Sequence, residues 1–159
     1  MLITLKDIVD EDFVNYKNPS MFIIFPYCTF KCDKENGNQI CQNSSLIKEP
    51  NVSVEIAAVV NRYCHNPITN SVVCGGLEPF DSWLELVKLI TEFRKRTQDD
   101  IVIYTGYKEE EIAEQVKQLA QFPNIVIKYG RFIPNQTSRL DDVLGIKLAS
   151  PNQYARRIS

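Results

Sequence analysis

The sequence predicts a single α/β domain whose sheet is built from parallel strands. Short runs of β-branched and apolar residues alternate with longer segments in which apolar residues recur at helical spacing. This repeated order of strand and then helix is typical of a parallel sheet. The chain has 159 residues, of which 44% are hydrophobic. This is long enough to form one hydrophobic core and too short to expect two. We therefore expect one domain over residues 1–159.

The elements follow from local patterns along the chain. In order, they are a strand at 21–25 (MFIIF), a helix at 54–63, a strand at 71–74 (SVVC), a helix at about 82–96, a strand at 101–104 (IVIY), a helix near 109–121 and a strand at 125–128 (IVIK). The second helix has the clearest pattern, because Trp83, Leu86, Ile90 and Phe93 recur at helical spacing. Glycine, proline and asparagine are scattered through residues 129–159, which predicts an ordered loop with a possible short strand at 144–148.

Charge and composition exclude several classes of partner. The chain carries 18 basic and 20 acidic side chains, so it lacks the positive charge that nucleic acid or an anionic membrane attracts. No apolar stretch approaches the roughly 20 residues that span a bilayer, and the first residues include acidic side chains. Five unevenly spaced cysteines favour reduced thiols or metal ligands over a disulfide framework. We expect a cytoplasmic protein with no nucleic-acid or membrane partner.

Three cysteines follow the first predicted strand in one loop, residues 26–43. Cys28, Cys32 and Cys41 lie within fourteen residues of one another, and thiolates grouped in this way predict a metal site. Structural zinc usually takes four protein ligands, whereas an iron–sulfur cluster with three cysteine ligands leaves one iron open to another molecule. The loop therefore predicts a metal centre and hints at a reactive cluster.

Two further unusual loops follow the second and third predicted strands, at residues 75–79 (GGLEP) and 105–107 (TGY). Ligands of parallel α/β folds bind at the carboxyl ends of the strands, so we expect these loops beside the cysteine loop. Gly75 and Gly76 suit a tight turn, or they leave the backbone open to a ligand. Glu78 adds a carboxylate that could accept a hydrogen bond from an ammonium group.

Taken in order, these motifs resemble a known family. The three-cysteine loop, GGLEP and residues 104–107 (YTGY) look like the radical S-adenosylmethionine enzymes, and more narrowly like the small glycyl-radical activases of anaerobic ribonucleotide reductase. Residues 129–133 (YGRFI) and 150–153 (SPNQ) resemble the "DGRF" and "SSNQ" segments of those activases. The resemblance covers about residues 21–157.

Three positions depart from the family's pattern. The usual cysteine spacing is C-x3-C-x2-C, whereas this chain has C-x3-C-x8-C, with the polar sequence DKENGNQI before Cys41. A looped-out insertion of this kind has a small entropic cost. Tyr129 stands in place of an acidic residue, and Pro151 replaces one of two serines.

The resemblance implies a fold, cofactors and partners. The fold would be a partial (β/α) barrel of the radical S-adenosylmethionine type. Cys28, Cys32 and Cys41 would hold a [4Fe-4S] cluster whose fourth iron binds S-adenosylmethionine. One electron from an external donor would then yield a 5′-deoxyadenosyl radical, which abstracts hydrogen from a glycine of the reductase large subunit. The residues implied near S-adenosylmethionine are Gly75, Gly76 and Glu78 at its amino group, Ile40 at the adenine and Thr105 on the ribose side.

Alternatives remain open from the residues alone. Cys64 and His65 could complete a zinc site with two loop cysteines. Alternatively, the three loop cysteines and a fourth ligand could hold structural zinc in a non-catalytic interaction module. Within the same family, the substrate could be another protein or a small molecule. Cys74 ends an apolar strand and is interpreted as a buried core residue. The single histidine leaves little room for a hydrolytic triad or a zinc-protease motif.

Overall fold

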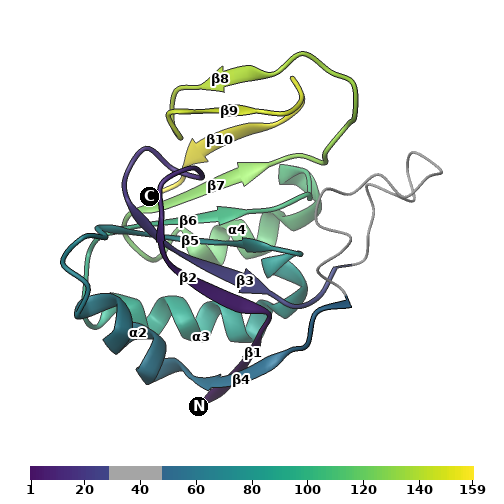
Figure 1. Cartoon of the computed structure of the whole chain (residues 1–159). Helices are drawn as coiled ribbons and strands as arrows, with labels where there is room; N and C mark the ends of the chain where they lie inside the picture. Colours follow the sequence, from purple (N-terminus) through teal and green to yellow (C-terminus); the bar gives the residue numbers. More distant parts are fainter. Residues whose placement is uncertain (29–47) are drawn as a thin grey trace.

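A six-stranded mixed sheet organises the chain (Figure 1). The computed structural model describes residues 1–28 and 48–159. Its strands are β1 (Leu2–Leu5), β2 (Asp7–Asp12), β3 (Ser20–Phe25), β4 (Val52–Glu55), β5 (Ser71–Gly76), β6 (Asp100–Tyr104), β7 (Ile125–Tyr129), β8 (Arg139–Asp141), β9 (Ile146–Leu148) and β10 (Tyr154–Arg157). Its helices are α2 (Ile56–Cys64), α3 (Trp83–Arg94) and α4 (Ala113–Leu119), with short 3₁₀ turns η2 (Pro79–Ser82) and η3 (Glu109–Ile112).

The strand order in the main sheet is β10-β7-β6-β5-β3-β2. The four strands β3, β5, β6 and β7 are parallel, and an antiparallel strand borders them on each side. Because the parallel strands follow one another in sequence order and such crossovers are right-handed, the three helices lie on one face of the sheet (Figure 1). The predicted α/β architecture with a mostly parallel sheet is confirmed. The closure into a partial barrel stays a prediction.

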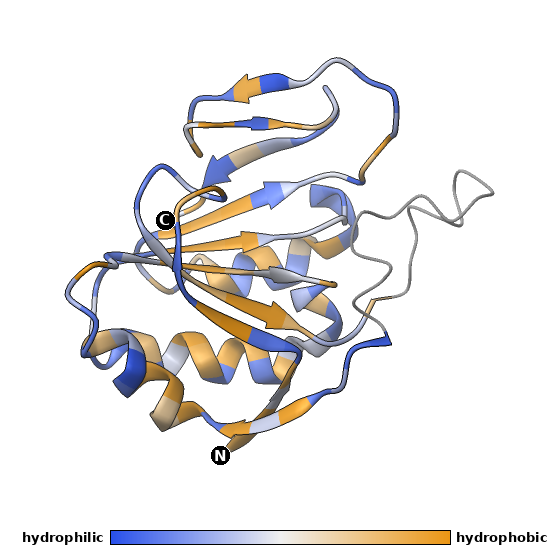
Figure 2. Cartoon of the chain, in the orientation of Figure 1, coloured by the Kyte–Doolittle hydropathy of each residue, from blue (hydrophilic) through white to orange (hydrophobic). Residues whose placement is uncertain are grey.

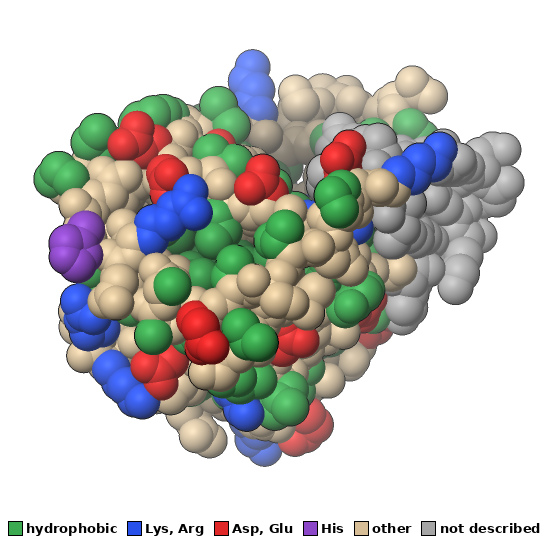
Figure 3. All heavy atoms as spheres, turned by 60° about the horizontal axis from the view of Figure 1, so that its bottom comes forward, with side chains coloured by type: hydrophobic (Ala, Val, Ile, Leu, Met, Phe, Trp, Pro, Cys, Tyr) green, Lys and Arg blue, Asp and Glu red, His purple; other side chains and the backbone are tan. Residues whose placement is uncertain are grey.

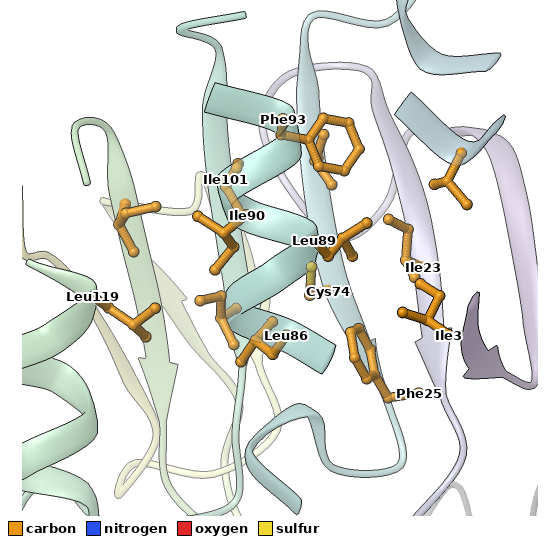
Figure 4. Packing of buried hydrophobic residues seen from close by; sticks show 14 of the residues in the cluster. Ile3, Ile23, Phe25, Cys74, Leu86, Leu89, Ile90, Phe93, Ile101 and Leu119 are labelled. Atoms are coloured by element: carbon orange, nitrogen blue, oxygen red, sulfur yellow. The ribbon is translucent and has the colours of Figure 1, made fainter. Parts of the chain in front are cut away.

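Alternate side chains of the central strands enter two separate clusters. Ile101 and Ile103 of β6 face the helices, whereas Val102 between them faces the opposite side. Figure 4 shows the helix-side cluster, in which strand residues meet Leu86, Leu89, Ile90 and Phe93 of α3. Figure 2 shows that the central strands consist mostly of hydrophobic residues. Burial on both faces explains why their sequences are nearly continuous apolar runs.

The face without helices is covered by two other segments. Residues 13–19, between β2 and β3, contribute the buried ring of Tyr16, and the β8–β9 hairpin contributes Leu144 and Leu148. These side chains pack on Val102 and its neighbours in the sheet. A backbone hydrogen bond of 2.8 Å from Lys17 N to Leu144 O joins the two segments. Together they leave part of this face uncovered, and a pocket lies there.

Two sequence expectations need correction. Residues 52–55 form strand β4, paired with β1, so the first helix begins at Ile56 rather than at Val54. The prediction of a loop after Tyr129 is wrong, because this segment forms β8, β9 and β10. Strand β10 extends the main sheet beside β7. The expected short strand at 144–148 is present as β9. The pattern did not predict β1 or β2. Strand β2 (DIVDED) lies at the edge of the sheet, and acidic residues replace the apolar ones that are usual in a strand.

The helix-covered side of the molecule carries no dominant charge. Figure 3 shows acidic and basic side chains interspersed with hydrophobic ones over this side. Across residues 1–28 and 48–159, no helix combines the length and the apolar character needed to cross a membrane.

Candidate functional site

Hydrogen bonds join the loops at the carboxyl ends of the parallel strands into one rim. Glu78 N donates to Tyr27 O at 2.8 Å, which joins the loop after β5 to the segment after β3. Thr105 N donates to Lys128 O at 2.9 Å, and Gly130 N donates to Tyr107 O at 3.2 Å, which joins the ends of β6 and β7. The expectation that these loops share one edge of the sheet is therefore confirmed for the part of the chain that is described.

The two glycines at the end of β5 are required by close packing on β3. Gly76 has φ of +85°, and a Cβ there would lie 2.4 Å from Ile24 Cγ2 and 2.9 Å from Ile24 Cα. A Cβ on Gly75 would lie 2.8 Å from the ring of Phe22. The pair belongs to the strand rather than to a turn after it, and its lack of side chains lets β3 and β5 approach each other where the rim begins.

Glu78 is a buried carboxylate that ties two loops together. Its side chain is 4% exposed. Oε1 accepts hydrogen bonds from Thr105 Oγ1 at 2.8 Å and from Gly106 N at 2.9 Å, and Oε2 accepts one from Phe80 N at 3.1 Å. Thr105 Oγ1 in turn accepts from Tyr107 N at 3.0 Å. The polar atoms of Glu78 and Thr105 are thus bonded to the two loops, and their first structural role is to fix the loops against each other.

Burial raises the pKa of Glu78 to about 7, from an ordinary value of 4.5, although its hydrogen bonds oppose the shift. The folded protein therefore holds more protons at this site than the unfolded chain between pH 4.5 and about 7. Because the folded state binds this extra proton, the raised pKa of Glu78 stabilises the folded protein at low pH. This stabilisation is lost as the pH rises through the window.

This shift predicts a pH-dependent difference between the wild type and Glu78→Gln. We expect the free energy of unfolding of the wild type to fall relative to that of the variant as the pH rises from about 4.5 to about 7. The glutamine keeps the shape of the side chain but does not titrate, so any loss of hydrogen bonding is a constant offset. Urea unfolding at several pH values measures the difference, and parallel curves for the two proteins would refute the assignment.

A pocket of about 530 Å³ lies on the uncovered face of the sheet and reaches the rim. At the rim it is lined by Cys28, Gly76, Glu78 and Thr105, and its floor includes Phe22 and Tyr104. The volume lies within the range of about 300 to 1,000 Å³ that is usual for sites of small molecules and cofactors. The structure therefore brings four of the predicted site residues to one pocket, and Gly75 lies beside the ring of Phe22, which also lines it.

The two tail motifs meet at the far side of this pocket. Asn152 Nδ2 donates to Arg131 O at 2.9 Å, and Gln153 Nε2 donates to Gly130 O at 3.4 Å. Arg131 is buried and forms a bidentate pair with Glu111, with distances of 2.7 and 2.8 Å. Residues 129–133 and 150–153 thus form one hydrogen-bonded unit, which η3 anchors through Glu111.

The remaining predicted ligands fall into two groups. Cys32, Cys41 and Ile40 lie outside the described residues. Cys64, at the end of α2, lies near the amino ends of the strands, because its neighbour Tyr63 bonds to Asp99, directly before β6, at 2.6 Å. Cys28 lies at the carboxyl ends of the strands, so Cys64 and His65 are placed at the opposite edge of the sheet from it.

Two further observations concern metal ligands among the described residues. Within the described ranges, no group of three or more histidine, cysteine or acidic side chains is arranged to hold a metal ion. Cys74 is buried, as expected of a core residue, and burial raises the pKa of its thiol to about 12. A thiol kept protonated in this way is a poor metal ligand.

Sequence reasoning missed several residues that line the pocket. Lys128 is buried at the end of β7, with its Nζ 5.5 Å from the centre of the Tyr104 ring. Val14 and Asn15 enter from the loop before β3. Tyr104 and Lys128 could have been found, since they are partners in adjacent strands and end apolar runs with polar atoms. Val14 and Asn15 carry no such signal.

The comparisons with known proteins give one match. The sequence model of a family described as a 4Fe-4S single cluster domain matches residues 20–150, which include all three cysteines of the loop. No curated protein and no solved structure matches the chain significantly.

Proposed function

The chain belongs to the 4Fe-4S single cluster domain family, and on this premise we propose that it is a radical S-adenosylmethionine enzyme that activates anaerobic ribonucleotide reductase. Membership makes it a domain that binds an iron–sulfur cluster. We assign the cluster to Cys28, Cys32 and Cys41, because thiolates are the usual ligands of such clusters. The partial (β/α) barrel of the radical S-adenosylmethionine type is part of the same proposal.

One observation supports the proposal most strongly: the separate motifs of the resemblance come together around one pocket. GGLEP supplies Gly76 and Glu78, the TGY segment supplies Thr105, and the tail segments supply Gly130 and Gln153. These residues are far apart in the sequence, and hydrogen bonds join the loops that carry them. A simple electron-transfer domain or a zinc module has no use for such a pocket beside its cysteine loop.

The residues fit the two cofactors in two respects: cysteine thiolates can ligate the cluster, and the pocket has space for S-adenosylmethionine. Cys28 lines the pocket, so a cluster held by the cysteine loop would face the space that S-adenosylmethionine needs. When bound and reduced, the cluster would supply one electron that cleaves S-adenosylmethionine to methionine and a 5′-deoxyadenosyl radical.

The chain's own residues would bind and orient S-adenosylmethionine. Gly75 and Gly76 would leave backbone groups within reach of its amino end, and Ile40 would pack on the adenine. Glu78 and Thr105 would hold the two loops that contact the amino group and the ribose, since their side chains are bonded to each other at 2.8 Å. The apolar walls of Phe22 and Leu148 would exclude water from a reactive intermediate.

The substrate in this proposal is the large subunit of anaerobic ribonucleotide reductase. The tail supports it, because the segments that resemble "DGRF" and "SSNQ" are bonded to each other in the structure rather than lying apart. The glycyl radical would form on the large subunit, and an external one-electron donor would reduce the cluster.

The test is a coupled assay with anaerobically reconstituted protein. We expect the reduced protein to convert S-adenosylmethionine to 5′-deoxyadenosine, and to produce a glycyl radical signal by electron paramagnetic resonance when the reductase large subunit is added. Formation of 5′-deoxyadenosine without a glycyl radical would redirect the proposal to another substrate. A protein that binds zinc and no iron would instead support the interaction module.

A further inference from the structure

We propose that Lys128, at the end of β7, makes one side of the pocket a binding site for a carboxylate group of a reactant. This inference deepens the proposed function and rests on it, since it concerns what else binds in the same pocket. It gives a role to a buried charge that the proposed contacts with S-adenosylmethionine do not use.

Lys128 is a basic residue in a buried position. Only 8% of it is exposed, and it lines the pocket. Taking an ammonium group out of water costs free energy unless polar or charged groups compensate for the loss. The residues before it in β7 are apolar and fully buried: Ile125, Val126 and Ile127. A fourth apolar residue would fill this position without that cost, so we attribute the lysine to an interaction that needs its charge.

Two contacts hold the ammonium group at the β7 side of the pocket. Nζ donates a hydrogen bond to Gly130 O at 3.3 Å and lies 5.5 Å from the centre of the Tyr104 ring. The carbonyl and the ring are uncharged, and both residues line the pocket. A lysine ammonium group has three N–H donors, so a carboxylate in the pocket can join the contacts that it already makes. Such a bond pairs opposite charges away from bulk water, where it is strong.

Opposite charges occupy different sides of the pocket. In the described part of the chain, Glu78 is the acidic side chain that lines it, and its oxygens accept hydrogen bonds from Thr105, Gly106 and Phe80. Glu78 follows β5, whereas Lys128 belongs to β7, and β6 lies between these two strands (Figure 1). A cationic group of a reactant is therefore favoured toward β5, and an anionic group is favoured toward β7.

Two reactants of the proposed reaction carry carboxylates. S-adenosylmethionine has one beside its amino group, and a polypeptide substrate has those of its aspartate and glutamate side chains. Neighbouring strands lie about 4.8 Å apart, so roughly 10 Å separates β5 from β7. In the proposed contacts the amino group lies at Gly75 and Gly76 of β5 and the ribose at Thr105, directly after β6, so Lys128 lies beyond the ribose. This order favours an acidic side chain of the substrate, close to the glycine that loses its hydrogen.

The experiment measures, by calorimetry on the reconstituted protein, the affinity for three ligands. They are S-adenosylhomocysteine, 5′-methylthioadenosine, which lacks the amino and carboxylate groups, and the reductase large subunit. Lys128→Met removes the charge, and Lys128→Gln removes it but keeps a donor for Gly130 O. We expect both variants to bind the large subunit about tenfold more weakly than the wild type, because a hydrogen bond between charged groups is lost. The control Lys88→Met, which removes an exposed charge from α3 on the helix-covered side, should bind it as the wild type does.

The three ligands separate the outcomes. Weaker binding of the large subunit alone assigns the carboxylate to the substrate. Weaker binding of S-adenosylhomocysteine with unchanged binding of 5′-methylthioadenosine also supports the site, and assigns the carboxylate to S-adenosylmethionine.

Two results would overturn the inference. One is equal affinity of the wild type and both Lys128 variants for every ligand that the wild type binds, which would leave Lys128 a structural residue that bonds Gly130 O. The other is an equal loss of affinity for S-adenosylhomocysteine and 5′-methylthioadenosine, which would show general damage to the pocket. A wild type that binds neither adenosyl compound overturns instead the proposed function on which the inference rests.

Discussion

Replacing Cys28 with alanine is expected to abolish the iron–sulfur cluster. In the proposed assignment each of the three cysteines supplies one bond to the cluster, and the described part of the chain has no group of three or more histidine, cysteine or acidic side chains that could hold a metal instead. Iron content and visible absorption after anaerobic reconstitution measure the effect, and both should fall to background. We expect the same result for Cys32→Ala and Cys41→Ala.

The other two cysteines provide the controls. Cys64 is exposed near the opposite edge of the sheet, and Cys74 is buried in the core, so Cys64→Ala and Cys74→Ala should keep a normal cluster. Cys74→Ala should also lower stability slightly, because it leaves a small cavity. Normal iron content in Cys41→Ala would show that the eight-residue spacing has been assigned to the wrong ligand.

Replacing Gly76 with alanine is expected to lower the free energy of unfolding by about 2 to 5 kcal/mol. Roughly 1 to 2 kcal/mol comes from the left-handed φ and the remainder from overlap with β3. The added Cβ would lie 2.9 Å from Ile24 Cα, which is backbone and cannot move aside without disturbing the sheet. The free energy of unfolding of a whole domain is about 5 to 15 kcal/mol, so this loss is a large fraction of it. Urea unfolding measures it.

Gly75→Ala is the matched control for this effect. Its neighbour is the edge of the Phe22 ring, a side chain that can tilt, so a cost of about 1 kcal/mol is expected. If the Gly76 and Gly75 variants lost equal stability, the close backbone approach at Gly76 would not be the cause.

The central fold could be predicted because local and long-range preferences agree there. Residues 101–104 (IVIY) and 125–128 (IVIK) are buried on both faces, and such strands are continuous apolar runs. The edge strands could not be predicted in the same way. Strand β10 (YARR) has charged residues, and its Arg157 binds Asp100 at the start of β6, a contact that no local pattern reveals.

The candidate site was predictable where it lies at the ends of those strands. Cys28, Gly76, Glu78 and Thr105 follow directly from the rule that parallel strands bind ligands at their carboxyl ends. The opposite wall of the pocket was not predictable. Val14 and Leu148 reach it from segments whose positions depend on tertiary contacts, such as the burial of Tyr16.

The most direct test of the account is electron paramagnetic resonance of the reduced, reconstituted protein with and without S-adenosylmethionine. A [4Fe-4S] cluster held by three cysteines has one iron open to that ligand, so the account predicts that adding S-adenosylmethionine changes the cluster's signal. A signal that is identical with and without S-adenosylmethionine, or a cluster that is absent altogether, would contradict it.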